Sequence, residues 1–276
     1  MASSASKLIP SDPEKVMVIR HVTPQIVTLS TPFLRFGRVK IGGRGTLVKM
    51  ANGSVAVFSP VDLTDTVKKE SELLGTVKYI VAVDQEHHIF LESWHKAYPD
   101  AKVLGPETLP AYRDKQGYFK IPDTHWHLLK KENPASPSID PDFDSEFDVE
   151  YVHGHVNKEL VFNHRPSRTL IEGDLLFNLP AHEQFSKTNV SPESGILTKI
   201  FNALQNTKGS ATWQKRMTWY GTSSGDRPAF NESVNRIAKW DFEKIIPCHG
   251  DVIESDGKGV FEKVMEWNLK AGKKST

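Results

Sequence analysis

The chain has 276 residues, of which 38% are hydrophobic and 25% charged, and its formal net charge is +1. This composition is typical of a folded protein with a full hydrophobic core, and the scattered basic residues exclude an extended nucleic-acid track. The single cysteine, Cys248, excludes an intramolecular disulfide and agrees with a reducing compartment. No apolar run is long enough to span a bilayer, and the start of the chain has no signal-peptide core. We therefore expect a cytoplasmic protein without nucleic-acid or membrane partners.

The first half of the chain predicts a hairpin and then a helix. Asn52-Gly53 lies between two apolar runs, and both residues tolerate the positive φ angles of a tight β-turn. A helix is expected over residues 64–74, where Gly75 ends it.

The next stretch combines a strand with a group of titratable side chains. Residues 77–83 form a nearly unbroken apolar run, which predicts a strand buried on both faces. Apolar residues return at helical spacing from Ile89. Side chains at the carboxyl end of such a strand lie where ligand sites of layered α/β proteins gather. Four titratable residues stand at this point: Asp84, Glu86, His87 and His88.

The second half of the chain predicts a second set of strands. The expected elements are a strand meander over residues 147–171, a helical and loop segment at about 180–220, a helix over 230–240, a strand over 244–248 and a helix over 260–269. Two groups of strands separated by helices predict two sheets with helices outside. We expect one domain over residues 14–276, after a flexible lead-in at residues 1–13.

Three further strand ends carry metal-capable side chains beside a glycine. The candidates at these strand ends are His155, Asp174 and His249. His153, beside His155, is the less favoured histidine of its pair. Imidazole and carboxylate ligands suit zinc, and also iron or manganese where oxygen ligands dominate. An open coordination position on such a metal lowers the pKa of bound water to around 7.

The order and spacing of these motifs resemble the metallo-β-lactamase fold superfamily over roughly residues 39–269. The resemblance implies an α+β fold, a four-layer αββα sandwich, and a hydrolase whose site usually binds two metals. It assigns Glu86 and His87 to the Asp-His pair that ends the family's histidine-rich motif. It also assigns His155 to the third-motif histidine, Asp174 to the metal-bridging aspartate and His249 to the final-motif histidine.

The sequence departs from the family's His-x-His-x-Asp-His motif. Ala82 and Asp84 stand where the family has histidines, and Glu86 replaces the aspartate. A register shifted by one would place His88 at the last histidine, but it would put a glutamine on a ligand position. The preferred register leaves one metal position with Glu86, His87, Asp174 and His249, and a second with His155, Asp174 and Asp84. We therefore expect zinc, one ion rather than two, with iron or manganese as alternatives.

Each assignment has a structural alternative. Glu86 and His87 also suit a helix N-terminus, Asp174 suits a turn, and His249 suits a buried histidine bonded to a backbone carbonyl. The alternation of side chains along a strand predicts that Cys248 faces the core while its neighbour faces the site.

The charged residue Arg44 shows nothing in the sequence beyond ordinary surface charge.

The resemblance implies a metal-dependent hydrolase in which Asp174 holds the metal and orients the attacking water. Its small-molecule substrate would be an ester, lactone, amide or thioester. The missing histidines motivate an alternative, a non-catalytic member of the fold that binds a ligand or partner. A nuclease of the same superfamily is disfavoured, because added basic or zinc-bearing segments are not found. The sequence leaves the oligomeric state open.

Overall fold

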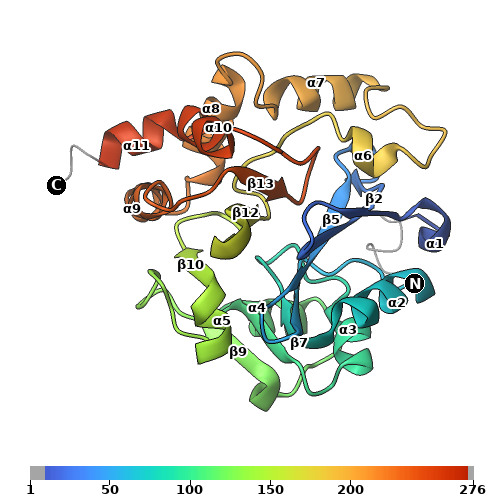
Figure 1. Ribbon diagram of the computed structural model, residues 1–276. Helices are drawn as coiled ribbons and strands as arrows, with labels where there is room; N and C mark the ends of the chain where they lie inside the picture. Colours follow the sequence, from blue (N-terminus) through green and yellow to red (C-terminus); the bar gives the residue numbers. More distant parts are fainter. Residues whose placement is uncertain (1–9, 273–276) are drawn as a thin grey trace.

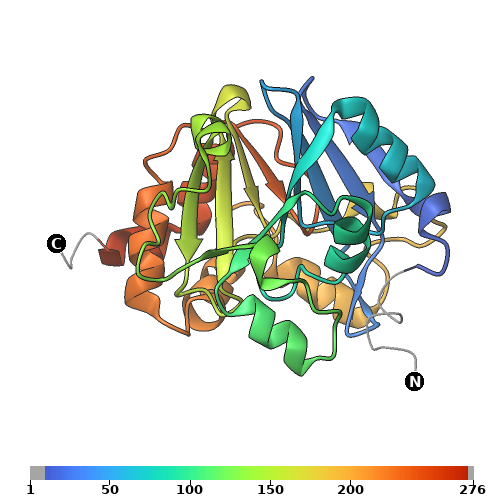
Figure 2. The same cartoon turned by 90° about the horizontal axis from the view of Figure 1, so that it is seen from below.

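The computed structural model describes residues 10–272, which form two β-sheets lying face to face with helices on both outer sides (Figures 1 and 2). The predicted lead-in lies for the most part outside this range, and its last residue begins the short helix α1 (Pro13–Val16). The predicted α+β fold with four layers is confirmed.

The first sheet has seven strands, and its second half is parallel. Asn52 and Gly53 form the turn of an antiparallel pair within it, as predicted, with Gly53 at φ 82°. In sheet order the strands are β1 (Val18–His21), β2 (Ile26–Thr31), β5 (Gly43–Lys49), β6 (Ser54–Phe58), β7 (Thr76–Val81), β8 (Lys102–Pro106) and β9 (Trp126–Leu129).

The second sheet has four strands. Three of them form the predicted antiparallel meander, and the fourth pairs in parallel with the third. In sheet order these are β10 (Phe147–Val152), β11 (Glu159–His164), β12 (Thr169–Glu172) and β13 (Lys244–Pro247). A separate two-stranded hairpin is formed by β3 (Leu34–Arg35) and β4 (Val39–Lys40).

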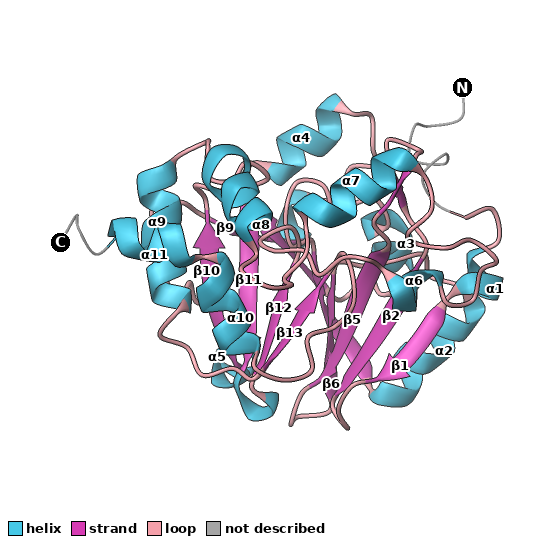
Figure 3. Cartoon of the chain, turned by 90° about the horizontal axis from the view of Figure 1, so that it is seen from above, coloured by secondary structure: helices cyan, strands magenta, loops and turns pink. Residues whose placement is uncertain are grey.

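Helices cover the outer face of each sheet (Figure 3). The first sheet is covered by α2 (Asp65–Leu74), α3 (Leu91–Ala97) and α4 (Leu109–Lys115), and the second by α9 (Arg227–Ile237), α10 (Gly257–Val264) and α11 (Glu266–Gly272). The predicted last helix is therefore two helices, because Met265 leaves the helical conformation at φ −86° and ψ 7°. The remaining helices are α5 (Pro141–Glu146), α6 (His182–Phe185), α7 (Ile196–Leu204) and α8 (Thr212–Met217).

Three apolar layers hold these elements together. The central layer lies between the sheets and includes Phe58, Tyr79, Phe162 and Cys248, so the cysteine faces the core as predicted. The two outer layers pack the helices against the sheets and are likewise fully buried. Burial of apolar surface on this scale is the main stabilising contribution to such a sandwich. No helix within residues 10–272 is long and apolar enough to cross a membrane.

Candidate metal centre

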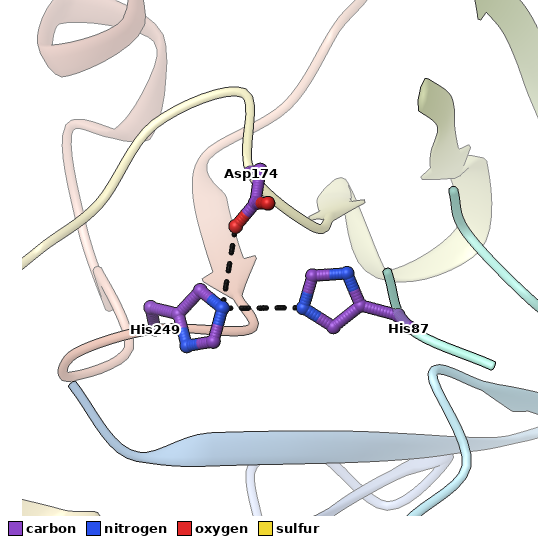
Figure 4. Close-up of side chains that lie close together, drawn as sticks. All are labelled: His87, Asp174 and His249. Atoms are coloured by element: carbon purple, nitrogen blue, oxygen red, sulfur yellow. Dashed lines mark hydrogen bonds and ion pairs between the residues drawn. The ribbon is translucent and has the colours of Figure 1, made fainter. Parts of the chain in front are cut away.

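Three strand ends from both sheets converge on one place. Strand β7 leads to His87, β12 leads to Asp174, and β13 leads to His249. The parallel pairing of β12 with β13 sets Glu172 opposite Pro247, so the residues that follow both strands emerge side by side. Within residues 10–272, His87, Asp174 and His249 form the one group of three or more potential ligands whose atoms lie within 4.8 Å of one another (Figure 4).

The chain between β7 and α3 forms a tight turn rather than the start of a helix. The carboxylate oxygen Oδ1 of Asp84 accepts hydrogen bonds from the backbone N–H of Glu86 at 2.7 Å and of His87 at 2.8 Å. A side chain that bonds its own backbone in this way competes with helix formation. Helix α3 therefore starts only at Leu91, and His87 points inward to the cluster.

The two histidines of the cluster turn their Nε2 atoms toward each other at 3.2 Å. His87 Nδ1 lies 2.9 Å from Asp84 Oδ1, and His249 Nδ1 lies 2.7 Å from the carbonyl oxygen of Gly42. Both partners are acceptors, so each Nδ1 carries the proton and donates it. The neutral ring of His249, and that of His87 once it gives up its second proton, then directs a lone pair on Nε2 into the cluster.

Asp174 supplies the third electron-rich atom. Its Oδ1 lies 3.2 Å from His249 Nε2 and has no hydrogen-bond donor, although it is buried. Its Oδ2 accepts a bond from Asn157 Nδ2 at 2.6 Å, and its backbone N–H donates to Glu159 Oε2 at 2.9 Å. One carboxylate oxygen is thus held by the protein, and the other faces the two imidazoles.

The charges of the cluster act on one another. Burial opposes protonation of His87, but the adjacent Asp84 carboxylate outweighs it and raises the pKa of His87 well above its usual value. Burial lowers the pKa of His249, although Asp174 partly offsets it. Burial disfavours the charged form of Asp174, but the close contact with His249 and the charge of His87 hold the pKa of Asp174 below its usual range. The carboxylate is therefore ionised at neutral pH.

This donor set fits a metal ion. The Nε2 atoms of two imidazoles and a carboxylate oxygen face one another, which is unfavourable unless a cation or a proton lies between them. The raised pKa of His87 shows that a proton takes this place when no cation is bound. Two histidines and one aspartate are suitable zinc ligands, and each histidine donates its other N–H to an acceptor, as metal-binding histidines do.

Glu86 and Asp84 do not lie in the group of facing ligand atoms. The Glu86 carboxylate accepts a bond from Tyr112 Oη at 3.1 Å and lies 3.6 Å from Arg35, with 37% of its side chain exposed. Asp84 Oδ1 is occupied by the turn and by His87, and its buried Oδ2 has no partner. Of the four residues expected at the better-preserved metal position, the structure brings together His87, Asp174 and His249 but not Glu86.

His155 is buried behind the cluster and uses both ring nitrogens within the protein. Its Nδ1 accepts a bond from the backbone N–H of Asn157 at 3.0 Å. Its Nε2 therefore carries the proton and faces the Asp174 carbonyl oxygen at 3.4 Å and Glu159 Oε2 at 3.3 Å. Burial lowers the pKa of His155, so the ring is neutral. The expected second metal position does not form as a cluster of facing ligand atoms.

Arg44, which the sequence suggested was a surface charge, is buried beside the cluster. Its Nη1 donates to the carbonyl oxygens of Pro247 and Gly250, both at 2.7 Å, and these two residues flank His249. Its Nη2 pairs with Glu183 at 3.3 Å. The guanidinium therefore fixes the loop that carries His249 against the first sheet. One basic residue within a strand gives no sequence signal for this role, because burial depends on which loop covers it.

Asn157 and Glu159 are two further supporting residues that the sequence analysis missed. Asn157 also accepts a bond at its carbonyl oxygen from Gln85 N at 3.0 Å, and so joins the loop after β7 to the second sheet. Glu159 is fully buried, and it accepts bonds from the N–H groups of Gly173 and Asp174. The sequence signal that could have identified Glu159 is a glutamate at the first position of strand β11, directly before its apolar residues.

Close backbone approach makes one glycine necessary at the site. A Cβ on Gly173 would lie 2.9 Å from Val83, 3.3 Å from Asp84 Oδ2 and 3.4 Å from His87 Nδ1. Any larger residue would therefore push the turn after β7 away from β12.

Aromatic rings border the cluster on one side. The ring of Phe177 lies 4.9 Å from that of His249, and the ring of Phe33 lies 6.3 Å from it, between centroids. Phe201 of α7 packs on Phe177 at 6.1 Å. This apolar border limits water on that side and strengthens electrostatic interactions at the cluster.

Solved metallo-β-lactamases share the fold of this chain over most of their length. A metallo-β-lactamase from Erythrobacter litoralis superimposes with a TM-score of 0.61 at 11% identity, covering 92% of this chain and 97% of that one. FIM-1 from Pseudomonas aeruginosa, in its mono-zinc form, gives 0.57 at 11% identity, covering 93% and 96%. A mutant flavo-diiron protein from Thermotoga maritima gives 0.58 at 14% identity, covering 91% of this chain and 62% of that one. The protein has the metallo-β-lactamase fold.

The amino-acid sequence matches one protein family. Residues 34–221, more than half of the chain, match the model of a domain of unknown function, DUF4336. The chain belongs to this family. No curated protein matches the sequence.

Proposed function

We propose that the protein is a metal-dependent hydrolase with one zinc ion held by His87, Asp174 and His249. The observation that carries this proposal is the meeting of His87 Nε2, His249 Nε2 and the unbonded Asp174 Oδ1 within 4.8 Å of one another, an arrangement that requires a cation or a proton between them. A bound zinc ion would supply a Lewis acid and would lower the pKa of a coordinated water to around 7. Iron or manganese is the alternative ion.

The chain's own residues would prepare the site for attack on a carbonyl. Asp84 and Gly42 hold the two imidazoles in the tautomer that binds cations, and Asn157 holds Asp174 so that only Oδ1 faces the reacting centre. Such prior orientation is a large part of catalytic power. The aromatic border of Phe33 and Phe177 favours a small ester, lactone, amide or thioester with an apolar group beside its carbonyl. We also propose a cytoplasmic location, in line with the single buried cysteine.

Metal analysis tests the proposal directly. The protein is expressed in medium with zinc, and separately with manganese or iron, and its metal content is measured after desalting. We expect about one ion per chain, and we expect His249→Ala to lose both the ion and turnover on an ester, lactone and thioester panel. His21→Ala is the matched control, because this histidine is exposed on β1 and pairs with Glu70. Absence of a stoichiometric ion under every condition would reject the proposal.

The tightly bonded surroundings favour a second candidate, a non-catalytic protein that binds a ligand in the same place. Asp84 and His155 are engaged within the protein, and His249 is only 3% exposed. For such a protein, whether or not it binds a metal ion, turnover of the ester, lactone and thioester panel by the unmodified protein would not exceed that by the His249→Ala variant. Retained turnover of the unmodified protein above this variant decides for the hydrolase.

A further inference from the structure

Helix α7 presents three apolar side chains to the outside, while its inner side combines the polar Thr198 and Asn202 with Phe201, which packs on Phe177. Ile196 is 78% exposed, and Leu197 and Ile200 are each 52% exposed. Thr198 and Asn202, on the opposite side of the helix, are buried. A helix packed on a protein core normally shows the reverse arrangement, so this outer face has no partner within the described chain.

Hydrogen bonds on the inner side hold α7 in this orientation. Thr198 Oγ1 accepts a bond from Lys40 N at 3.3 Å, and Asn202 Nδ2 donates to the Pro192 carbonyl oxygen at 3.1 Å. Lys40 Nζ also donates to the Ser194 carbonyl oxygen at 2.8 Å. The helix therefore cannot roll its apolar face inward without leaving these groups unpaired.

The adjoining hairpin β3–β4 exposes a further aromatic residue. Phe36 at its tip is 77% exposed and has a φ of 53°, in the left-handed region. A bulky residue in this conformation costs about 1–3 kcal/mol, and it stabilises nothing in the core. Arg35 lies over its ring at 5.2 Å. An exposed, conformationally strained phenylalanine is expected where it contacts something outside the chain.

Basic residues stand in the same two segments as these apolar side chains, and one of them, Arg35, lies 3.6 Å from Glu86. Residues 33–41 contain Arg35, Arg38 and Lys40 and no acidic residue, whereas the whole chain has 35 basic and 34 acidic residues. Lys199 adds a positive charge on α7 itself. Glu193, the acidic residue just before α7, is paired with His182 at 3.0 Å.

We propose that this surface, called here the docking face (Phe36, Ile196, Leu197 and Ile200 with Arg38, Lys40 and Lys199), binds the surface of an anionic lipid bilayer. Apolar side chains flanked by basic ones insert at the boundary of headgroups and acyl chains, and the cations are attracted to anionic headgroups. A second copy of the chain on this face would bring the same basic residues against each other, which disfavours self-association. The sequence predicted no membrane partner because no segment can span a bilayer, but binding at the surface requires no spanning segment. The docking face contains no member of the metal cluster, so this proposal stands apart from the proposed hydrolase activity.

Vesicle co-sedimentation tests the docking face. The whole chain is mixed with vesicles of phosphatidylcholine alone and of phosphatidylcholine with 30% phosphatidylserine, at low and at physiological salt. We expect binding to the anionic vesicles that weakens as salt rises, and little binding to the neutral ones. Arg38→Gln with Lys199→Gln should weaken binding roughly 25-fold, since each basic residue near an anionic surface contributes about fivefold. Phe36→Ser with Ile200→Ser should weaken binding to the anionic vesicles at both salt concentrations.

The matched control is Leu73→Ser on α2, which removes another exposed leucine, 72% exposed, far along the chain from the docking face. Thermal unfolding of every variant checks that the fold is kept, and the charge variant tests the proposal even if the apolar one fails to fold. Absence of binding to anionic vesicles overturns the proposal, and so does equal weakening by Leu73→Ser. A concentration-dependent dimer that Phe36→Ser with Ile200→Ser disperses, without vesicle binding, would replace the bilayer with a second copy.

Discussion

The two histidines inside the candidate metal centre, His87 and His249, differ from the neighbouring His155 in the hydrogen-bond partners of their ring nitrogens. In His87 and His249, Nδ1 contacts an acceptor within the protein, and Nε2 faces the Nε2 atom of the other histidine. In His155, by contrast, both ring nitrogens contact partners within the protein. The difference shows that a histidine at a strand end is available to a metal only when its surroundings leave one lone pair unsatisfied. Motif position is alike in the two cases, and burial does not separate His249 from His155, since they are 3% and 1% exposed.

The largest effect is expected from His87→Ala. Removing one of three facing ligands should lower zinc affinity by roughly 100-fold or more, because supporting residues alone account for 10–100-fold. Zinc titration with a competing chelator measures this. Unchanged affinity would mean that the facing lone pairs do not hold the ion, and the comparison with His155 would fail.

A smaller loss is expected from Asp84→Asn. The variant keeps an acceptor for the turn but removes the charge that makes His87 basic, so zinc affinity should fall about 10-fold. The same chelator titration measures it. Asp241→Asn serves as a control, since this carboxylate pairs with Arg168 on the surface. An equal loss in both variants would count against a specific role for Asp84.

His155→Gln should separate structure from metal binding. We expect the free energy of unfolding to fall by about 2–3 kcal/mol, since the half-buried Asn157 N–H and the buried Glu159 lose a partner. Zinc stoichiometry should stay as in the unmodified protein. Denaturant unfolding and metal analysis on the same sample measure both quantities. Loss of zinc without loss of stability would make His155 a ligand after all.

The smallest effect is expected from Glu86→Gln. Its carboxylate contacts Tyr112 and Arg35 at the surface, so zinc affinity should change by less than about twofold and stability by less than about 0.5 kcal/mol. A large loss of zinc would show that the side chain turns into the cluster when metal is present, as the family motif implied.

Much of the fold could be predicted because it depends on local patterns. The apolar run before Asp84 predicted a buried strand, and Asn52-Gly53 predicted a hairpin, since periodicity and turn chemistry act over a few residues. The order of His87, Asp174 and His249 at strand ends predicted which segments would meet. The resemblance built on that order named the fold that the superposition confirms.

The finer roles could not be predicted because they depend on contacts between distant segments. Arg44 was placed on the surface, yet it binds carbonyl oxygens more than 200 positions away. Asp84 was proposed as a ligand, yet its Oδ1 accepts hydrogen bonds from the backbone of its own turn, and Asp84 lies outside the group of facing ligand atoms. A carboxylate or guanidinium looks the same in sequence whether it faces water, a backbone or a metal.

By itself, the sequence determined the two sheets, the helices around them and the strand ends that carry imidazoles and carboxylates. The tertiary structure alone decided which of those groups keep a free lone pair, because hydrogen-bond partners come from loops brought together only by folding. It also decided that Ile196, Leu197 and Ile200 of α7 face outward, since the hydrogen bonds of Thr198 and Asn202 hold the opposite side of the helix inward. Periodicity indicates that a helix has two faces, and packing decides which one is buried.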